Sequence, residues 1–170
     1  MSVAPLLIRQ ISLADIEDFR RIRLESLQRE PDAFASTFEE WSAFADVDWR
    51  QRMDRPMFVA FDTNEPVGLM SLKRFEQPKM RHRAVLGMVY VRKSFRGSGV
   101  STSLLDAVFK YAGAEQISQI ELAVREDNRS ALNFYRNQGF QKVGSIPNGF
   151  VDGDEGFREI VMVRLLLHHR

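Results

Sequence analysis

The sequence contains no cysteine among its 170 residues, and this absence excludes several kinds of chemistry. Without thiols the chain can form neither a disulfide nor a thiolate metal site, and it has no cysteine nucleophile. The absence also fits a reducing compartment. A chain of this length buries about 70% of its unfolded surface, so it needs no disulfide or metal to fold. We therefore expect one domain over residues 1–170.

Long apolar runs and a strong charge of one sign are also missing. No stretch approaches the roughly 18 consecutive apolar residues that span a bilayer, and Met1–Arg9 lacks the basic start and long apolar core of a signal peptide. The formal net charge is only +1, which gives no reason to expect nucleic-acid binding. Two adjacent histidines at the C-terminus, His168 and His169, predict no metal site. We expect a soluble cytoplasmic protein that binds neither nucleic acid nor membrane.

The hydrophobic periodicity of the chain predicts alternating helices and strands. A capping box of Ser12 and Asp15 should open a first helix, with apolar residues on one face and Arg and Glu on the other. Further helix starts are expected at Ser36 or Thr37 and at Asp48. Helices should also cover 104–112, ended by Gly113, and 128–137. Strands are expected at 6–11, 57–61, 67–72, 84–91, 117–124, 140–146 and 157–166. This order predicts a mixed α/β sandwich.

Two strand regions carry more specific expectations. The near-continuous apolar run Ala84–Val91 predicts a strand that is buried on both faces. A polar loop containing Pro147, Gly149, Gly153 and Gly156 should join the last two strands.

The stretch Val89–Val100 reads as a strand, a short basic loop and the first turn of a helix. Gly97 and Gly99 allow a tight turn and close approach of a ligand to the backbone. The N–H groups that open the helix suit a phosphate or pyrophosphate. Three basic residues add positive charge: Arg92, Lys93 and Arg96. Neither a Walker A motif nor G-x-G-x-x-G is present, so ATP hydrolysis and a dinucleotide fold have no support. Taken alone, the loop could equally be an ordinary turn with solvated arginines.

The stretch Asn128–Phe140 reads as a second unit of interest. Asn128 can cap a helix that Gly139 ends. Phe134 should face a core, and Tyr135, one step round the helix, should point elsewhere. The segment is either a simple capped helix or one that holds the Tyr135 phenol near a reacting atom as a proton donor.

Considered together, the two stretches resemble the GNAT superfamily of acyl-CoA-dependent N-acyltransferases. The loop Arg96-Gly97-Ser98-Gly99-Val100-Ser101 looks like the family's pyrophosphate-binding motif, and Asn128, Ala131, Tyr135 and Gly139 follow at the family's spacing. The order of strands and helices also matches over nearly the whole chain. The resemblance implies a mixed, mostly antiparallel central sheet with helices on both faces.

The resemblance also implies roles for individual residues, with acetyl-CoA as co-substrate and no metal. The strand should splay from its neighbour and offer backbone groups near Val89 and Val91 to the pantetheine arm. Asn128 should contact the pantetheine region, and Tyr135 should protonate the departing thiolate. The pyrophosphate should be held by the loop, at Arg96, Gly97, Ser98, Gly99, Val100 and Ser101.

Two departures from the family pattern matter. Ser101 stands where Gly or Ala is usual, although a serine is small enough to preserve binding. The strand Ala84–Val91 lacks the glutamate base that many members place there. Deprotonation of the amine would then come from Glu39, Glu40, His82 or a water relay. For each of these side chains an ordinary solvated or structural role is favoured over a catalytic one, so no base is assigned.

The leading interpretation is an N-acetyltransferase that moves acetyl directly from acetyl-CoA to a primary amine of a small molecule, with Tyr135 as general acid. The acceptor should enter between the early helices and the loop between the last two strands. The acidic segment 152–156, with Glu39 and Glu40, would favour a cationic amine, or would simply remain solvated. Small amine metabolites, antibiotics, amino acids and protein N-termini all stay open.

Two alternatives belong to other functional classes. The first is a CoA-binding regulatory module of the same fold with little or no turnover, and the second is a nucleotide-binding protein that uses the loop for another phosphate ligand. Exposed apolar surface on the terminal strands would also allow a homodimer.

Overall fold

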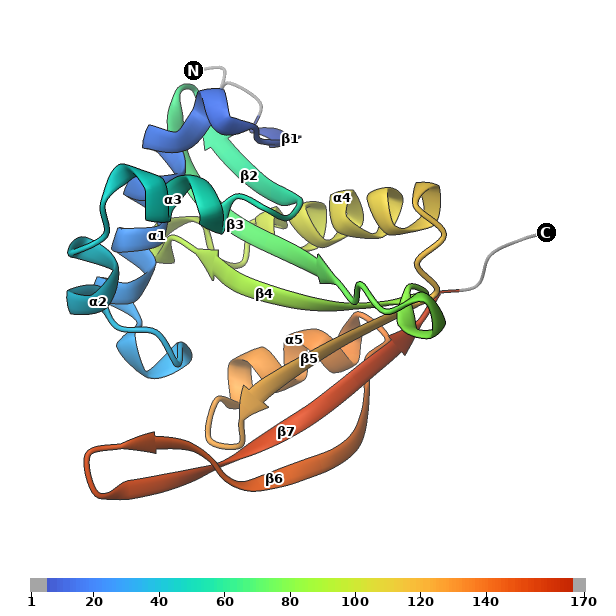
Figure 1. Cartoon of the computed structure of the whole chain (residues 1–170). Coiled ribbons are helices and arrows are strands. Elements are labelled where there is room, and N and C mark those ends of the chain that lie inside the picture. Colours follow the sequence, from blue (N-terminus) through green and yellow to red (C-terminus); the bar gives the residue numbers. More distant parts are fainter. Residues whose placement is uncertain (1–5, 167–170) are drawn as a thin grey trace. The chain divides into compact units, whose positions relative to one another are not determined.

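The computed structural model describes residues 6–166, and its strands form one seven-stranded sheet in the order β1-β2-β3-β4-β5-β7-β6 (Figure 1). The pairs β1–β2, β2–β3, β5–β7 and β6–β7 are antiparallel, whereas β4 and β5 pair in parallel. The predicted mixed, mostly antiparallel sheet is confirmed.

The sheet and its helices follow the predicted order along the chain. The strands are β1 (Leu7–Gln10), β2 (Met57–Asp62), β3 (Glu65–Arg74), β4 (Arg83–Val91), β5 (Gln119–Arg125), β6 (Gln141–Asp152) and β7 (Glu155–Leu165). The α-helices are α1 (Ile16–Arg29), α2 (Phe38–Ser42), α3 (Asp46–Arg52), α4 (Val100–Ala114) and α5 (Arg129–Asn137). Short 3-10 helices are η1 (Leu13–Asp15), η2 (Pro31–Ala33), η3 (Pro78–Met80) and η4 (Lys93–Phe95).

The described residues divide into two compact units. The first comprises residues 6–73 and 86–112, and the second comprises 74–85 and 113–166. Strand β4 contributes Leu86–Val91 to the first unit and Arg83–Val85 to the second. Its parallel pairing with β5 joins Arg83–Val85 to Gln119–Glu121, within the second unit.

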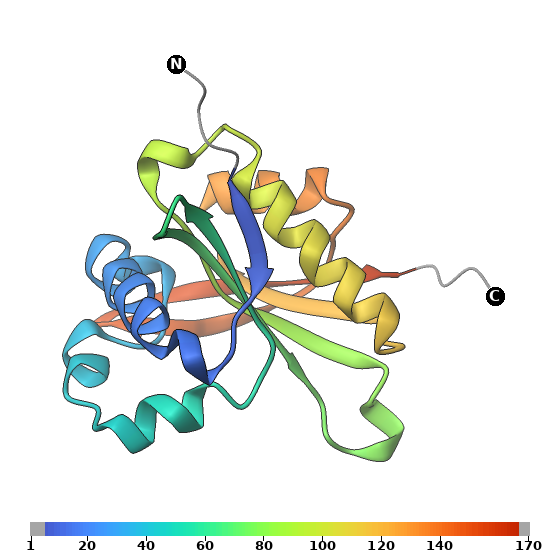
Figure 2. The same cartoon turned by 90° about the horizontal axis from the view of Figure 1, so that it is seen from above.

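Helices cover both faces of the strands in the first unit. In β2, Met57, Val59 and Phe61 belong to the cluster beneath α1–α3, whereas the ring of Phe58 lies 5.7 Å from that of Tyr111 on α4. This alternation is what a strand with a period of two residues requires. Figure 2 shows α1–α3 on one side of β2 and β3, with α4 on the other.

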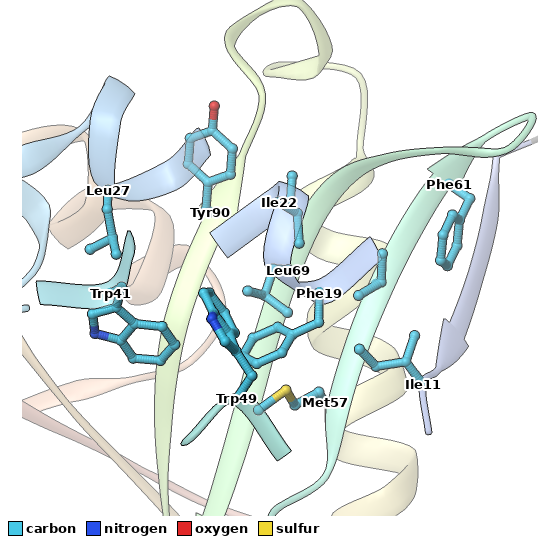
Figure 3. Packing of buried hydrophobic residues seen from close by; sticks show 11 residues of the cluster. Ile11, Phe19, Ile22, Leu27, Trp41, Trp49, Met57, Phe61, Leu69 and Tyr90 are labelled. Carbon is cyan, nitrogen blue, oxygen red and sulfur yellow. The ribbon is translucent and has the colours of Figure 1, made fainter. Parts of the chain in front are cut away.

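The core of the first unit is an aromatic cluster to which α1, α2 and α3 all contribute (Figure 3). Phe19 of α1, Trp41 of α2 and Trp49 of α3 are at most 3% exposed. The Phe19 and Trp49 rings are 5.4 Å apart, and those of Trp41 and Trp49 are 5.3 Å apart, both edge to face. Such pairs add about 0.5–1.5 kcal/mol to the burial of the rings. Because α2 and α3 have only five and seven residues, this packing stabilises them more than helix propensity does.

The second unit is built on the antiparallel strands β5, β7 and β6, with α5 (Figure 1). Ile120, Leu122 and Val124 alternate along β5 and are buried, as is Met162 of β7. Among the described residues, no helix is both long and apolar enough to cross a membrane. His168 and His169 lie outside the described residues.

Helix starts and hairpins agree well with the sequence predictions. Ser12 and Asp15 form the predicted capping box, and Thr37 caps α2. Helix α3 begins at Asp46, two residues before the predicted start, and Asp48 accepts a hydrogen bond from the Ala45 N–H instead. Helix α4 continues past Gly113 to Ala114, so Gly113 does not end it.

Three other expectations are wrong. The predicted loop at 147–156 is strand apart from a tight turn at Gly153, because β6 is an edge strand, where proline and glycine are tolerated. Strand β4 is not buried on both faces, since Val85 is 37% exposed and Gly87, Met88 and Val89 are only half-buried. Finally, the polar face of α1 does not contain all its arginines, because Arg23 is buried.

Candidate functional site

The glycine loop of the first unit has the predicted strand–loop–helix form. β4 ends at Val91, η4 follows, and α4 begins at Val100. Gly97 and Gly99 have φ angles of 76° and 89°, in the left-handed region. A Cβ at either position would meet no atom within 4 Å, so these residues are needed for backbone conformation and not for space.

Helix α4 supplies backbone donors directly after this loop. The Ser103 N–H donates to the Gly99 carbonyl at 2.9 Å, which begins the helical hydrogen-bond pattern. The N–H groups of Val100 and Ser101 precede that bond and have no acceptor within the helix. Together with the positive end of the helix dipole, such donors suit a phosphate. The Ser98 hydroxyl instead donates to the Phe95 carbonyl at 2.5 Å and fastens the loop to itself.

The arginines of the loop are already committed to carboxylates. The Arg96 guanidinium donates from Nε to the Val91 carbonyl at 2.9 Å and from Nη2 to Glu30 at 2.6 Å. Arg92 makes a bidentate pair with Glu25, at 2.9 and 2.7 Å. These two side chains therefore shape the loop more than they add free positive charge, and they leave the backbone donors and Lys93 as its anion-binding groups.

Sequence reasoning missed a polar cluster beside the loop. Tyr90 donates from its hydroxyl to Glu25 at 2.9 Å, on the same carboxylate that Arg92 holds. The three residues line a cavity of about 890 Å³, together with Arg29, Glu30, Lys93 and Ser94. The hydrogen bond from Arg92, followed by that from Tyr90, lowers the pKa of Glu25, while burial and Glu25 raise the pKa of Tyr90 to about 12. No sequence signal could pair Glu25 with residues more than 60 positions away.

Replacing Tyr90 by phenylalanine should destabilise the fold by about 1.5–3 kcal/mol, the range for a hydrogen bond to a charged group. Thermal or urea unfolding at pH 7 measures this. The pKa of Glu25 is lower in the folded than in the unfolded protein. The ionised Glu25 carboxylate therefore stabilises the fold above its unfolded pKa of about 4.5, and this stabilisation is lost as the pH falls below that value towards the folded pKa. The difference in unfolding free energy between wild type and Tyr90→Phe should therefore shrink as the pH falls through the lowered pKa of Glu25 in the folded protein. A difference that stays constant after NMR shows the Glu25 carboxyl to be protonated in the folded wild type would contradict the Glu25 contact.

Strand β4 also contains a backbone feature that the sequence did not reveal. Met88 has a φ angle of 51°, a left-handed conformation that is rare for a residue with a long side chain inside a strand. Its side chain packs against the aromatic core cluster, which holds it there. Strained residues of this kind gather at functional sites, and this one is next to Val89.

The second unit contains the other two predicted site residues. Asn128 caps α5 as expected, since its side-chain oxygen accepts the Ala131 N–H at 3.2 Å. Tyr135 is only 5% exposed, and its ring lies 5.3 Å from Phe134 and 5.5 Å from Phe140. The expectation that Phe134 faces the core while Tyr135 points elsewhere is therefore reversed, because Phe134 is half-buried. Burial raises the pKa of the Tyr135 phenol well above its ordinary value.

The predicted site residues are thus divided between the two units. Val89, Val91 and the loop Arg96–Ser101 belong to the first, and Asn128 and Tyr135 to the second. Of the side chains considered for a base, Glu39 and Glu40 are exposed on α2, and His82 is exposed just before β4. Among the described residues, no three His, Asp or Glu side chains are grouped to hold a metal.

Comparison with known proteins agrees with this loop and fold. The pattern of the Acetyltransferase (GNAT) family matches residues 16–140, most of the chain. The protein belongs to this family of acyltransferases. The probable acetyltransferase of Staphylococcus epidermidis has the same fold, with a TM-score of 0.79 over 95% of this chain and 99% of that one, at 19% identity.

Two curated relatives are similar in sequence over much of the chain. The L-amino acid N-acetyltransferase AaaT of Escherichia coli is 25% identical over 148 residues, which are 84% of this chain and 87% of the relative. The N-alpha-acetyltransferase 30 of Schizosaccharomyces pombe is 30% identical over 107 residues, 61% of this chain and 69% of the relative. The chain spans only 56–60% of the length of two others.

Proposed function

We propose that the protein is an acetyl-CoA-dependent N-acetyltransferase that acetylates the primary amine of a small molecule. The observation that carries this proposal is the loop at Gly97 and Gly99, whose left-handed glycines lead into the N-terminus of α4. Family membership makes the pyrophosphate of CoA the natural ligand for these donors. The backbone near Val89 and Val91, and the side chain of Asn128, would then contact the pantetheine arm.

The proposed reaction is direct transfer. The unprotonated amine attacks the thioester carbonyl, the C–N bond forms, and the C–S bond of the tetrahedral intermediate breaks. Tyr135 gives its proton to the departing thiolate, and the proton lost by the amine returns to the phenol through solvent. A phenol carries its proton at neutral pH, as a general acid must, and burial raises the pKa of Tyr135 further from neutrality.

The names of the two relatives suggest which classes of acceptor to test. One acts on L-amino acids, and the other is named as an N-alpha-acetyltransferase. A panel of free amino acids, simple amines and short peptides, each with acetyl-CoA and a readout of free CoA, tests the proposal. We expect release of CoA with at least one acceptor class, and a product in which the amine carries the acetyl group.

A CoA-binding regulatory module remains the second candidate, because β4 carries no acidic residue to serve as the base. The acceptor panel separates these two candidates, and calorimetry separates both of them from a nucleotide-binding protein. Both candidates predict that acetyl-CoA binds and that ATP does not compete with it. If acetyl-CoA binds but no acceptor releases CoA, the regulatory module is favoured; if ATP competes, the loop serves another phosphate ligand.

A further inference from the structure

Arg23 lies in the middle of α1 with its charge buried and unsatisfied. The residue is only 3% exposed, and its Nε and Nη1 atoms make no hydrogen bond. Buried polar groups are nearly always hydrogen-bonded, so each exception requires a physical explanation. A buried charge that lacks a partner is more costly than a neutral group.

Aromatic rings account for part of the stabilisation of this charge. The Arg23 guanidinium carbon lies 4.4 Å from the centre of the Trp41 ring and 4.8 Å from that of Phe34. Burial lowers the pKa of Arg23 to about 10, which leaves it charged at neutral pH. The negative charge of Glu40 raises the pKa of Arg23, but Glu40 is exposed and accepts no hydrogen bond from Arg23. The rings stabilise the cation without supplying acceptors for its N–H groups.

A second guanidinium lies beside the same indole ring. Arg52 of α3 lies 5.8 Å from the Trp41 ring and 4.9 Å from Phe44. Among the described residues, no carboxylate pairs with either Arg23 or Arg52, whereas their neighbour Arg20 is paired with Asp46. Two unpaired cations around one indole form a site that attracts an anion.

The Arg23 site lies on the side of β4 that faces α1–α3, and β4 leads into the glycine loop. Trp41 and Tyr90 belong to the same buried cluster, and Figure 3 shows both beside β4. Tyr90 separates Val89 from Val91, the residues whose backbone is proposed to contact the pantetheine arm. An anion at Arg23 would therefore be on the same unit as the proposed cofactor contacts.

We infer that Arg23 binds a carboxylate of the acyl acceptor, so that the acceptor is an amino acid or another amine that also carries a carboxylate. A guanidinium presents parallel N–H donors that match the two oxygens of a carboxylate. Nε and Nη1 of Arg23 make no hydrogen bond within the protein, so they are donors left for such a carboxylate. This inference rests on the proposed acetyltransferase function and narrows its substrate class.

The test compares three acceptors that differ only in the group beside the amine: L-leucine, L-leucinamide and 3-methylbutylamine. The same comparison is repeated with the best L-amino acid of the panel. We expect the carboxylate form to have a kcat/KM at least about tenfold above the amide, the usual effect of a hydrogen bond to a charged group. Rates are compared at equal concentrations of unprotonated amine, because the three amines differ in pKa.

Arg23→Met removes the charge but keeps a long side chain. It should reduce kcat/KM for the amino acid to near that of the amide, mainly through KM, and affect the amide far less, because the amide has no carboxylate for Arg23 to bind. Arg21→Gln is the matched control, since it removes an exposed arginine from the same helix and should not change the preference. If Arg23→Met does not fold, Arg23→Lys and Arg52→Gln supply the comparison, and each should reduce the preference.

Two results would overturn the inference. One is a wild-type enzyme that acetylates the amide or the simple amine as well as the amino acid. The other is a preference for the amino acid that survives in the Arg23 variants. If no amine is acetylated at all, the proposed function fails separately. Calorimetry of the amino acid with the CoA-loaded protein then tests the site. Binding that Arg23→Met abolishes supports the inference, and the absence of such binding overturns it.

Discussion

Replacing Tyr135 by phenylalanine is expected to lower kcat by about 10²–10⁴-fold, the usual contribution of a general acid. The dissociation constant for acetyl-CoA should change little. The ring of Tyr135 packs between Phe134 and Phe140, and phenylalanine can keep both contacts. The substitution therefore removes the proton without creating a cavity.

Stopped-flow or steady-state kinetics measures kcat, and calorimetry measures acetyl-CoA binding on the same samples. The melting temperature confirms that the variant is folded. Tyr90→Phe is the matched control, because it also removes a buried phenol oxygen, but one that Glu25 holds. It should lower stability more than Tyr135→Phe does. Equal losses of kcat and of acetyl-CoA binding in Tyr135→Phe would show that the phenol serves binding and not proton transfer.

The pH dependence gives a second test of the same role. The pKa of Tyr135 is raised in the folded protein, so the protonated form that the reaction needs persists through the neutral and mildly alkaline range. The rate should rise with pH as the amine loses its proton, with no fall from Tyr135 ionisation below about pH 10, the ordinary tyrosine value. A decline between pH 8 and 9 that disappears in Tyr135→Phe would contradict the raised pKa of Tyr135, whereas a profile with the same shape in the wild type and in Tyr135→Phe up to the ionisation of the phenol leaves that raised pKa intact.

The parts of this fold that were predictable are those encoded by neighbouring residues. The capping box at Ser12, the cap at Asn128 and the loop at Gly97 and Gly99 each depend on residues within a few positions of one another. Such features depend on local backbone preferences, which the sequence displays directly.

The features that were missed depend on contacts between distant segments. Glu25 meets Tyr90 and Arg92 across more than 60 residues. Met88 is left-handed because its packing against the helical layer overrides the β preference of its strand. No local pattern contains either fact.

Arg23 shows how a general rule about the faces of an amphipathic helix can fail. An arginine in an amphipathic helix is normally assigned to the solvated face, and Arg21 and Arg29 of α1 support that rule. Arg23 is buried because Phe34 and Trp41, from the segments after α1, cover it. The burial of Arg23 could not be predicted from the sequence, and it is also the observation from which we infer a carboxylate on the acyl acceptor.

Changing both Gly97 and Gly99 to alanine should weaken acetyl-CoA binding by about tenfold or more. Each glycine is in the left-handed region, which costs an alanine about 1–2 kcal/mol. Since no atom lies within 4 Å of either Cβ position, the effect comes from the backbone and not from a clash. The loop can relieve the strain only by turning its N–H groups away from the ligand. Calorimetric titration with acetyl-CoA measures the loss.

Gly113→Ala is the matched control for this double variant. Gly113 lies in α4, its φ angle is not positive, and a Cβ there meets nothing within 4 Å. Alanine should stabilise that position by about 0.5–1 kcal/mol and leave acetyl-CoA binding unchanged.

The identity of the group that the loop holds can be tested with a shortened ligand. Acetyl-pantetheine keeps the thioester and the pantetheine arm but has no pyrophosphate. The wild type should bind acetyl-CoA more tightly than acetyl-pantetheine, and the double glycine variant should lose most of that difference while its affinity for acetyl-pantetheine stays the same. If both ligands weaken equally, the loop shapes the whole site and does not hold the pyrophosphate. If neither weakens while the melting temperature falls, the glycines serve folding alone.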